Sequence, residues 1–234
     1  RRCVRGGMLG NNSCGLHSLA YGSVREHVLE VDTILSDGSE ASFKALTKDE
    51  FRQKLNDNDN SLEKSIYENI NKILSDPKNQ QAIHEGFPDP KLTRRNMGYA
   101  IDVLLDSEVF TEGGDSFNFC KLLAGSEGTL AFSYRIKLKV IALPPKHKGL
   151  MCAHFKSLED SLQGNLIALK HRPTAIELMD DTIMECTKQN IEQRKNRFFL
   201  KGDPGALLMI EFSFDSEQEL KATAEKLEAD FRQA

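Results

Sequence analysis

Apolar and polar residues alternate along two stretches of the chain, and each stretch predicts a β-strand with one buried face. The first spans residues 27–36, and its more apolar set is Leu29, Val31, Thr33 and Leu35. Asp37-Gly38 then predicts a tight turn into a return strand with Ala41, Phe43 and Ala45. The second stretch has the cleanest alternation, and its apolar set is Leu130, Phe132, Tyr134, Ile136, Leu138 and Val140. One apolar and one wet face are typical of an antiparallel sheet.

Helical periodicity separates these two strands. Thr47-Lys48-Asp49-Glu50 has the sequence of a capping box and predicts a short helix, which the Asn- and Asp-rich run 56–60 ends. Ser61 is the expected cap of a second helix, which ends near Pro77 and carries apolar residues at helical spacing, Leu62, Ile66, Ile70 and Ile73. The polar, periodic span 47–81 thus predicts a helical insertion that lies on a sheet. A further short helix is expected at 119–124, stopped by Gly125.

The break at Leu143-Pro144-Pro145-Lys146 is typical of a domain boundary. Beyond it, strands are expected at 150–155, 174–179 and 207–214, and helices at 157–170, at 182–190 and from Asp215 onward, with Asp215 and Gln218 as the cap. The order β-α-β-α-β-α predicts a split βαβ sheet with helices on one face, although a ferredoxin-like sheet would want a further strand. The predicted fold class is α+β, with domains at 1–145 and 146–234.

Composition narrows the functional classes. The net charge of -4 gives no electrostatic reason to expect a nucleic acid or an anionic membrane as partner. No run of about 20 apolar residues occurs, so no transmembrane segment is expected. The five cysteines form no Cys-x-x-Cys pair and the six histidines are scattered, so we expect no disulfide framework and no metal site. This cysteine usage predicts a reducing, cytoplasmic compartment, and leaves a peripheral membrane attachment of a longer protein open.

Two glycine-rich segments are the candidate ligand-binding sites. The first runs from Gly6 to Gly15 and is a poor start for a helix, so we expect a loop there and an internal piece of a longer protein. The second, 125–129, precedes the long strand. Backbone N–H groups in such loops can bind phosphate, ribose or flavin oxygens. Neither segment has a P-loop lysine or a Gly-x-Gly-x-x-Gly pattern, so spacing alone leaves ligand binding and plain turns equally open.

Three motifs in order resemble the FAD-linked oxidases, flavoproteins of the vanillyl-alcohol-oxidase type with a PCMH-type FAD-binding domain. The segment 6–15, followed by Tyr21-Gly22 and the hairpin at 36–38, resembles the second half of the flavin domain. The segment 122–131 is similar to the second block of that domain, and 173–180 resembles the start of the substrate (cap) domain. The relatives that look most similar are the D-lactate, glycolate and D-2-hydroxyglutarate dehydrogenases.

The resemblance implies FAD as cofactor, a second FAD-binding subdomain of antiparallel sheet and surrounding helices over 1–145, and part of a ferredoxin-like cap over 146–234. The implied FAD contacts are Gly6, Gly7, Gly10, Asn11, Asn12, Ser13 and Gly15 in the first block and Glu127, Gly128 and Phe132 in the second. At the position of Phe132 the family usually has a smaller aliphatic residue. Catalytic residues are left unassigned.

The implied reaction is oxidation of a D-2-hydroxy acid by hydride transfer to the flavin, with a separate electron acceptor. The family's pyrophosphate-binding loop and the metal ligands of its later cap have no counterpart in this sequence. We therefore expect this chain alone to be inactive and to bind FAD weakly. The alternatives are a cofactor-free interaction module of the same fold and a same-fold flavoprotein that acts on another alcohol.

Single residues offer further hypotheses, each beside a plainer structural one. His17 either faces the flavin or is a surface histidine, and Cys14 is either a flavin attachment point or a small buried thiol. Glu177 lies among apolar residues of a predicted strand, so burial with a partner is expected. Candidate contacts for a substrate carboxylate are Arg172, Arg94 and Arg95.

Overall fold

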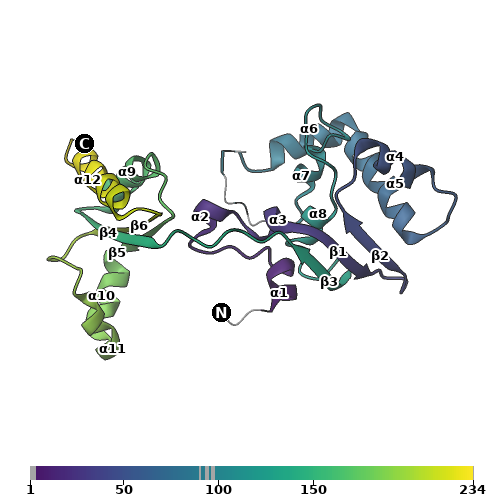
Figure 1. Cartoon of the computed structure of the whole chain (residues 1–234). Coiled ribbons are helices and arrows are strands. Elements are labelled where there is room, and N and C mark those ends of the chain that lie inside the picture. Colours follow the sequence, from purple (N-terminus) through teal and green to yellow (C-terminus); the bar gives the residue numbers. More distant parts are fainter. Residues whose placement is uncertain (1–3, 90, 93–94, 96–97, 234) are drawn as a thin grey trace. The chain divides into compact units, whose positions relative to one another are not determined.

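The computed structural model describes residues 4–89, 91–92, 95 and 98–233. The chain divides into two compact units, each with a three-stranded antiparallel sheet (Figure 1). The first unit holds the chain up to Gly15 together with Gly22–Ile141, and the second holds Leu16–Tyr21 together with the chain from Ala142 onward. Within the described residues, no helix has the length and apolar character needed to cross a membrane.

The sheet of the first unit has the order β2-β1-β3, with β1 at Val28–Ile34, β2 at Glu40–Lys44 and β3 at Phe132–Leu138. The turn between β1 and β2 closes as the sequence predicts, because Leu35 N donates to Ser39 O at 2.8 Å and Gly38 adopts a φ of +85°. The helices of this unit are α1 (Arg5–Gly10), α3 (Val24–His27), α4 (Lys48–Asn56), α5 (Leu62–Ser75), α6 (Pro77–Gly86), α7 (Ile101–Leu105) and α8 (Cys120–Leu123).

The predicted helical insertion covers one face of this sheet. Thr47 and Ser61 cap α4 and α5 as expected. The sequence pattern does not predict the next helix, α6. Pro77 does end α5, as expected, but it is also the first residue of α6, which Asp76 caps. Aromatic rings from the insertion, from β2 and from the segment before α8 pack edge to face in the core: Phe43, Phe51, Tyr67, Phe117 and Phe119.

Two β-bulges explain why the alternating patterns do not give one buried and one wet face. The pairing of β1 with β3 contains one extra residue in each strand, Leu29 in β1 and Tyr134 in β3. An extra residue puts every side chain beyond it on the opposite face. Leu29 is therefore 43% exposed and Phe132 is 67% exposed, against the predicted burial. Phe132 lies opposite Ile34, on the outward face of the sheet.

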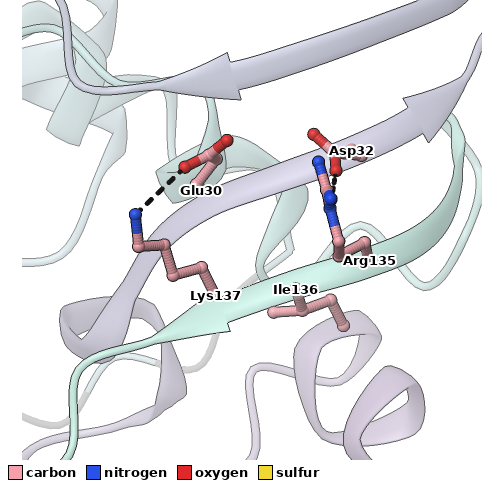
Figure 2. A pocket seen from close by; sticks show the side chains of 5 residues that line it. All are labelled: Glu30, Asp32, Arg135, Ile136 and Lys137. Carbon is pink, nitrogen blue, oxygen red and sulfur yellow. Dashed lines mark hydrogen bonds and ion pairs between the residues drawn. The ribbon is translucent and has the colours of Figure 1, made fainter.

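That outward face carries a ladder of cross-strand ion pairs over a hollow of about 400 Å³ (Figure 2). Arg135 pairs with Asp32, and Lys137 Nζ lies 3.4 Å from Glu30 Oε2, while Ile136 points to the other side of β3. The Ser42 hydroxyl and the Arg135 guanidinium hold the pKa of Asp32 below its ordinary value. Because each charge in the hollow faces an opposite one, the ladder fixes the register of β1 against β3 and leaves no excess charge for a ligand.

The second unit has the strand order β4-β6-β5, with β4 at His147–Phe155, β5 at Ala175–Asp180 and β6 at Ala206–Phe214. Both outer strands run antiparallel to β6 and hence parallel to each other, with one helix crossing between them. This is the predicted split βαβ arrangement. The remaining elements are α2 (Ser18–Tyr21), α9 (Leu158–Leu169), α10 (Asp181–Gln189), α11 (Ile191–Arg194), a 3-10 turn η1 (Lys195–Arg197) and α12 (Glu217–Gln233).

Helices α9 and α12 cover one face of the second sheet (Figure 1). Apolar residues of β6 that point toward them form the core with Ala168 of α9 and Leu227 of α12: Leu208, Ile210 and Phe212. Ser157 caps α9 as predicted, whereas α12 is capped by Ser216, whose Oγ accepts from Glu219 N at 3.4 Å, and not by Asp215.

The ion pair at Asp32 predicts a pH dependence of stability. The native pKa of Asp32 is lowered, so its contribution is present above the unfolded pKa of about 4 and is lost as the pH falls through the native pKa. We expect Asp32→Asn to flatten the acid limb of the unfolding free energy in urea titrations at a series of pH values. Asp49→Asn, in an exposed pair with Arg52, is the control. An acid limb identical to that of the unsubstituted protein would contradict the assignment.

Candidate functional site

The first glycine-rich segment is a short helix, not the expected loop. Helix α1 contains Gly6, Gly7 and Gly10, and its length of six residues is below what propensity alone can hold. Its C-terminus closes as a Schellman motif, because Ser13 N donates to Met8 O and Asn12 N donates to Leu9 O, both at 2.9 Å. The motif supplies the stop that the glycines of the helix do not.

Asn12 occupies the left-handed position of this motif, with a φ of +44°, as its residue type predicts. Glycine is the usual residue there, so the Asn12 side chain must have a role of its own. Its Oδ1 accepts from Arg25 N at 2.8 Å and from the Ser23 hydroxyl at 3.0 Å. The fully buried Asn12 side chain thereby ties the end of α1 to the start of α3.

The second glycine-rich segment is a tight turn between α8 and β3. Thr129 N donates to Ser126 O at 3.0 Å, and both central residues have positive φ, +53° at Glu127 and +77° at Gly128. Positive φ at both central positions is the signature of a type I′ turn, which favours Asn-Gly. A glutamate in this conformation costs about 1 kcal/mol, and strain of this kind gathers at functional sites.

The two glycine-rich segments lie side by side and are joined through their backbones. Gly125 N donates to Leu9 O at 3.0 Å, and Glu127 N donates to Gly10 O at 2.9 Å. A Cβ on Gly10 would stand 3.5 Å from Glu127 Cα, an ordinary van der Waals contact, so the two backbones lie within direct packing distance. The two candidate ligand-binding segments are therefore adjacent, as a shared cofactor would require.

The other candidate residues are distributed more widely. Phe132 exposes its ring on the ion-paired face of the first sheet, and Asn11 lies at the exposed C-cap of α1. Arg95 is ion-paired with Asp102, Arg172 is exposed with a φ of +52°, and Arg94 lies outside the described residues. Glu177 is exposed on β5, contrary to the expected burial.

The structure gives His17 a protein partner and does not bury Cys14 as the plainer hypothesis for that thiol expects. His17 Nε2 lies 3.0 Å from Glu211 Oε1 of β6, within the second unit, and Cys14 is partly exposed. Where side chains are described, no group of three His, Cys, Asp or Glu residues comes close enough to hold a metal ion.

Sequence reasoning missed two residues beside the glycine-rich segments. Arg25 is 6% exposed, and its Nη2 donates to Ala124 O at 2.6 Å, directly before Gly125. The Tyr99 hydroxyl lies 2.6 Å from the Thr129 hydroxyl at the end of the turn. The sequence signal for Arg25 is its position inside a short capped helix, beside the capping-box residue Glu26. That signal does not reveal its acceptors, which are distant in sequence.

Comparison with known proteins shows which family part of this chain resembles. Residues 144–234 match the family model described as FAD linked oxidases, C-terminal domain. The D-2-hydroxyglutarate dehydrogenase of Pseudomonas putida is 26% identical over 230 residues, which are 94% of this chain and 21% of that protein. The D-2-hydroxyglutarate dehydrogenase of Escherichia coli is 26% identical over 222 residues, 92% of this chain and 20% of that protein. Residues 144–234 are thus similar to the C-terminal domain of the FAD linked oxidases, and the whole chain is similar to part of these dehydrogenases.

A solved structure has a similar fold. A solved structure of alkyldihydroxyacetonephosphate synthase matches with a TM-score of 0.51 at 14% identity, covering 97% of this chain and 31% of that one. The α+β class with antiparallel sheets is thus confirmed. The chain spans about a fifth of the length of the curated FAD-linked oxidases it matches.

FAD is the cofactor that the match to the FAD linked oxidases and the similarity to these dehydrogenases imply, and the glycine-rich segments fit it. Gly6 and Gly15 have neither a positive φ nor any atom within 4 Å of a built Cβ, so internal packing does not require glycine at either position. A flat cofactor that lies close to the backbone would explain why glycine is present at these two positions. In addition, Asn12 Nδ2 is a buried donor without a partner in the described structure, as a site shaped for a polar ligand would have.

The strained turn yields a stability prediction. Glu127→Asn places the residue best suited to left-handed φ there, so we expect the unfolding free energy to rise by up to about 1 kcal/mol in thermal or urea denaturation. Glu127→Gln removes the same charge without relieving the backbone, so it is the matched control and should leave stability unchanged. Equal stabilisation by both variants would indicate a charge effect and contradict the strain.

The Asn12 side chain yields a second prediction. Asn12→Gly keeps the left-handed backbone but removes the acceptor of Arg25 N and of the Ser23 hydroxyl, so we expect a loss of about 1–3 kcal/mol in urea unfolding. Asn11→Gly, at an exposed position whose amide lies 3.4 Å from Ser13 Oγ, should change stability by no more than about 0.5 kcal/mol. Similar losses from the two variants would overturn the role given to Oδ1.

Proposed function

We propose that this chain supplies part of the FAD site and of the cap in an FAD-dependent dehydrogenase of D-2-hydroxy acids. The observation that carries the proposal is the pair of backbone hydrogen bonds joining α1 to the turn at Ser126–Thr129, with open glycines beside them. The relatives named D-2-hydroxyglutarate dehydrogenase support this substrate class. Residues 1–145 belong to the FAD domain in this proposal, and 146–234 begin the cap.

Main-chain groups and small side chains of this chain hold the cofactor. The residues proposed for this role are Gly6, Gly7, Gly10, Asn11, Asn12, Ser13 and Gly15 of the first segment, and Glu127, Gly128 and Phe132 after it. When bound, FAD accepts the hydride from the α-carbon of the hydroxy acid. The exposed amide at Gly128 and the carboxylate of Glu127 offer one donor and one acceptor beside α1.

Two features of the side chains support further parts of the proposal: the arginines bear on the substrate, and the thiols bear on the cellular compartment. A hydroxy acid brings a carboxylate that arginine binds well, and exposed Arg172 is available, whereas Arg95 is already engaged by Asp102. The thiols of Cys120, Cys152 and Cys186 are free, which supports a reducing cytoplasmic location. A separate electron acceptor completes the proposed turnover.

The test uses the polypeptide made from the complete reading frame that contains this sequence. It is purified, its visible absorbance is recorded without oxygen, and D-2-hydroxyglutarate, D-lactate and glycolate are added in turn. We expect bound flavin and loss of its visible absorbance with a D-2-hydroxy acid, and none with the L enantiomer. The 234-residue chain alone should bind FAD more weakly and reduce no acceptor.

The outcomes separate the rival functions. A protein that carries no flavin and takes up none in an FAD titration would be the cofactor-free module, and the proposal would be wrong. A flavoprotein whose absorbance is bleached by other alcohols but not by hydroxy acids would keep the cofactor and overturn the substrate class.

A further inference from the structure

Arg25 lies where the two glycine-rich segments meet, and its side chain bonds to backbone carbonyls. Nη2 donates to Ala124 O at 2.6 Å and to Gly98 O at 3.0 Å, and Nε donates to Lys121 O at 2.9 Å. Two of these acceptors lie at the C-terminal end of α8, where unpaired carbonyls attract a cation. The planar guanidinium thereby fixes the chain immediately before the type I′ turn.

The main chain of the same residue holds the other segment. Arg25 N donates to Asn12 Oδ1, and Lys121 Nζ donates back to Arg25 O at 2.9 Å. One residue therefore connects the end of α1, the start of α3 and the end of α8. No single surface contact could order three segments in this way.

The position of the guanidinium also explains a glycine. A Cβ at Gly125 would stand 2.8 Å from Arg25 Nη2 and 2.9 Å from Gly98 O, and the φ there is +99°. Glycine at this position is thus required by the arginine and by the backbone fold. Burial lowers the pKa of Arg25, and the carboxylates of Glu26 and Asp102 oppose that shift.

We propose that Arg25 is a positioning residue for the cofactor site, which sets α1 and the turn at 126–129 in their binding geometry before FAD arrives. The inference rests on the proposed function. A glycine-rich backbone loses much conformational entropy when it becomes ordered. If this ordering happened only when FAD binds, its free-energy cost would weaken the affinity for FAD. Arg25 makes that ordering a property of the free protein.

The first experiment measures hydrogen exchange in the 234-residue chain without FAD. The amides of Gly125 and Glu127, which donate to α1, should be protected, and Arg25→Lys should speed their exchange by at least about tenfold. Leu74→Ala, in the buried core of α5, is the control for general destabilisation, and exchange is compared at equal distance below each unfolding midpoint. Equal exchange at both amides in Arg25→Lys and Leu74→Ala would overturn the proposal.

The second experiment measures FAD association with the complete protein. Arg25→Lys should lower the association rate and affinity by about tenfold, Lys121→Met by less, and Leu74→Ala not at all. Guanidinium ion at concentrations below its denaturing range should partly restore Arg25→Ala, whereas sodium chloride should not. Unchanged FAD binding in Arg25→Lys would refute the positioning role, whereas absence of FAD binding in the unsubstituted protein would refute the proposed function itself.

Discussion

The junction of the two glycine-rich segments depends on two backbone hydrogen bonds between segments more than a hundred residues apart, from Gly125 N to Leu9 O and from Glu127 N to Gly10 O. Leu9 O accepts two donors, since Asn12 N also points to it. A carbonyl oxygen has two lone pairs, so Leu9 O can accept both the bond that ends α1 and the bond that joins α1 to Gly125, directly before the turn at 126–129. Without these bonds, a six-residue helix with three glycines would not be stable.

Backbone strain in the first unit is concentrated at this junction. Asn12 and Glu127 are its non-glycine residues with positive φ among those described, and both lie beside the joining hydrogen bonds. Asparagine adopts this conformation readily, whereas Glu127 costs about 1 kcal/mol, and the bonds to Arg25 and Gly10 hold the two residues in place. Asn-Gly in the turn would remove the strain at Glu127, whereas glycine at position 12 would lose the bonds that Asn12 Oδ1 accepts from Arg25 N and the Ser23 hydroxyl.

Helix caps and turns could be predicted from the sequence, whereas features that depend on contacts between distant segments could not. The caps at Thr47, Ser61 and Ser157 and the turn at Gly38 followed from a few neighbouring residues. The bulges depend on the register between two strands, so the pattern of β3 alone could not place Phe132 on the outward face. Arg25 escaped for the same reason, because its acceptors Lys121 and Ala124 lie 96 and 99 residues away.

Ion pairs within the chain reduce the number of cationic side chains that could bind an acidic substrate. The guanidinium of Arg95 already contacts the nearly buried carboxylate of Asp102, so drawing it to a ligand would leave that carboxylate unpaired. On the sheet face, Arg135 and Lys137 are likewise held by Asp32 and Glu30. These three cations of the first unit are therefore engaged in ion pairs within the unit, and the cofactor role proposed for it would rest on main-chain donors beside the buried Arg25.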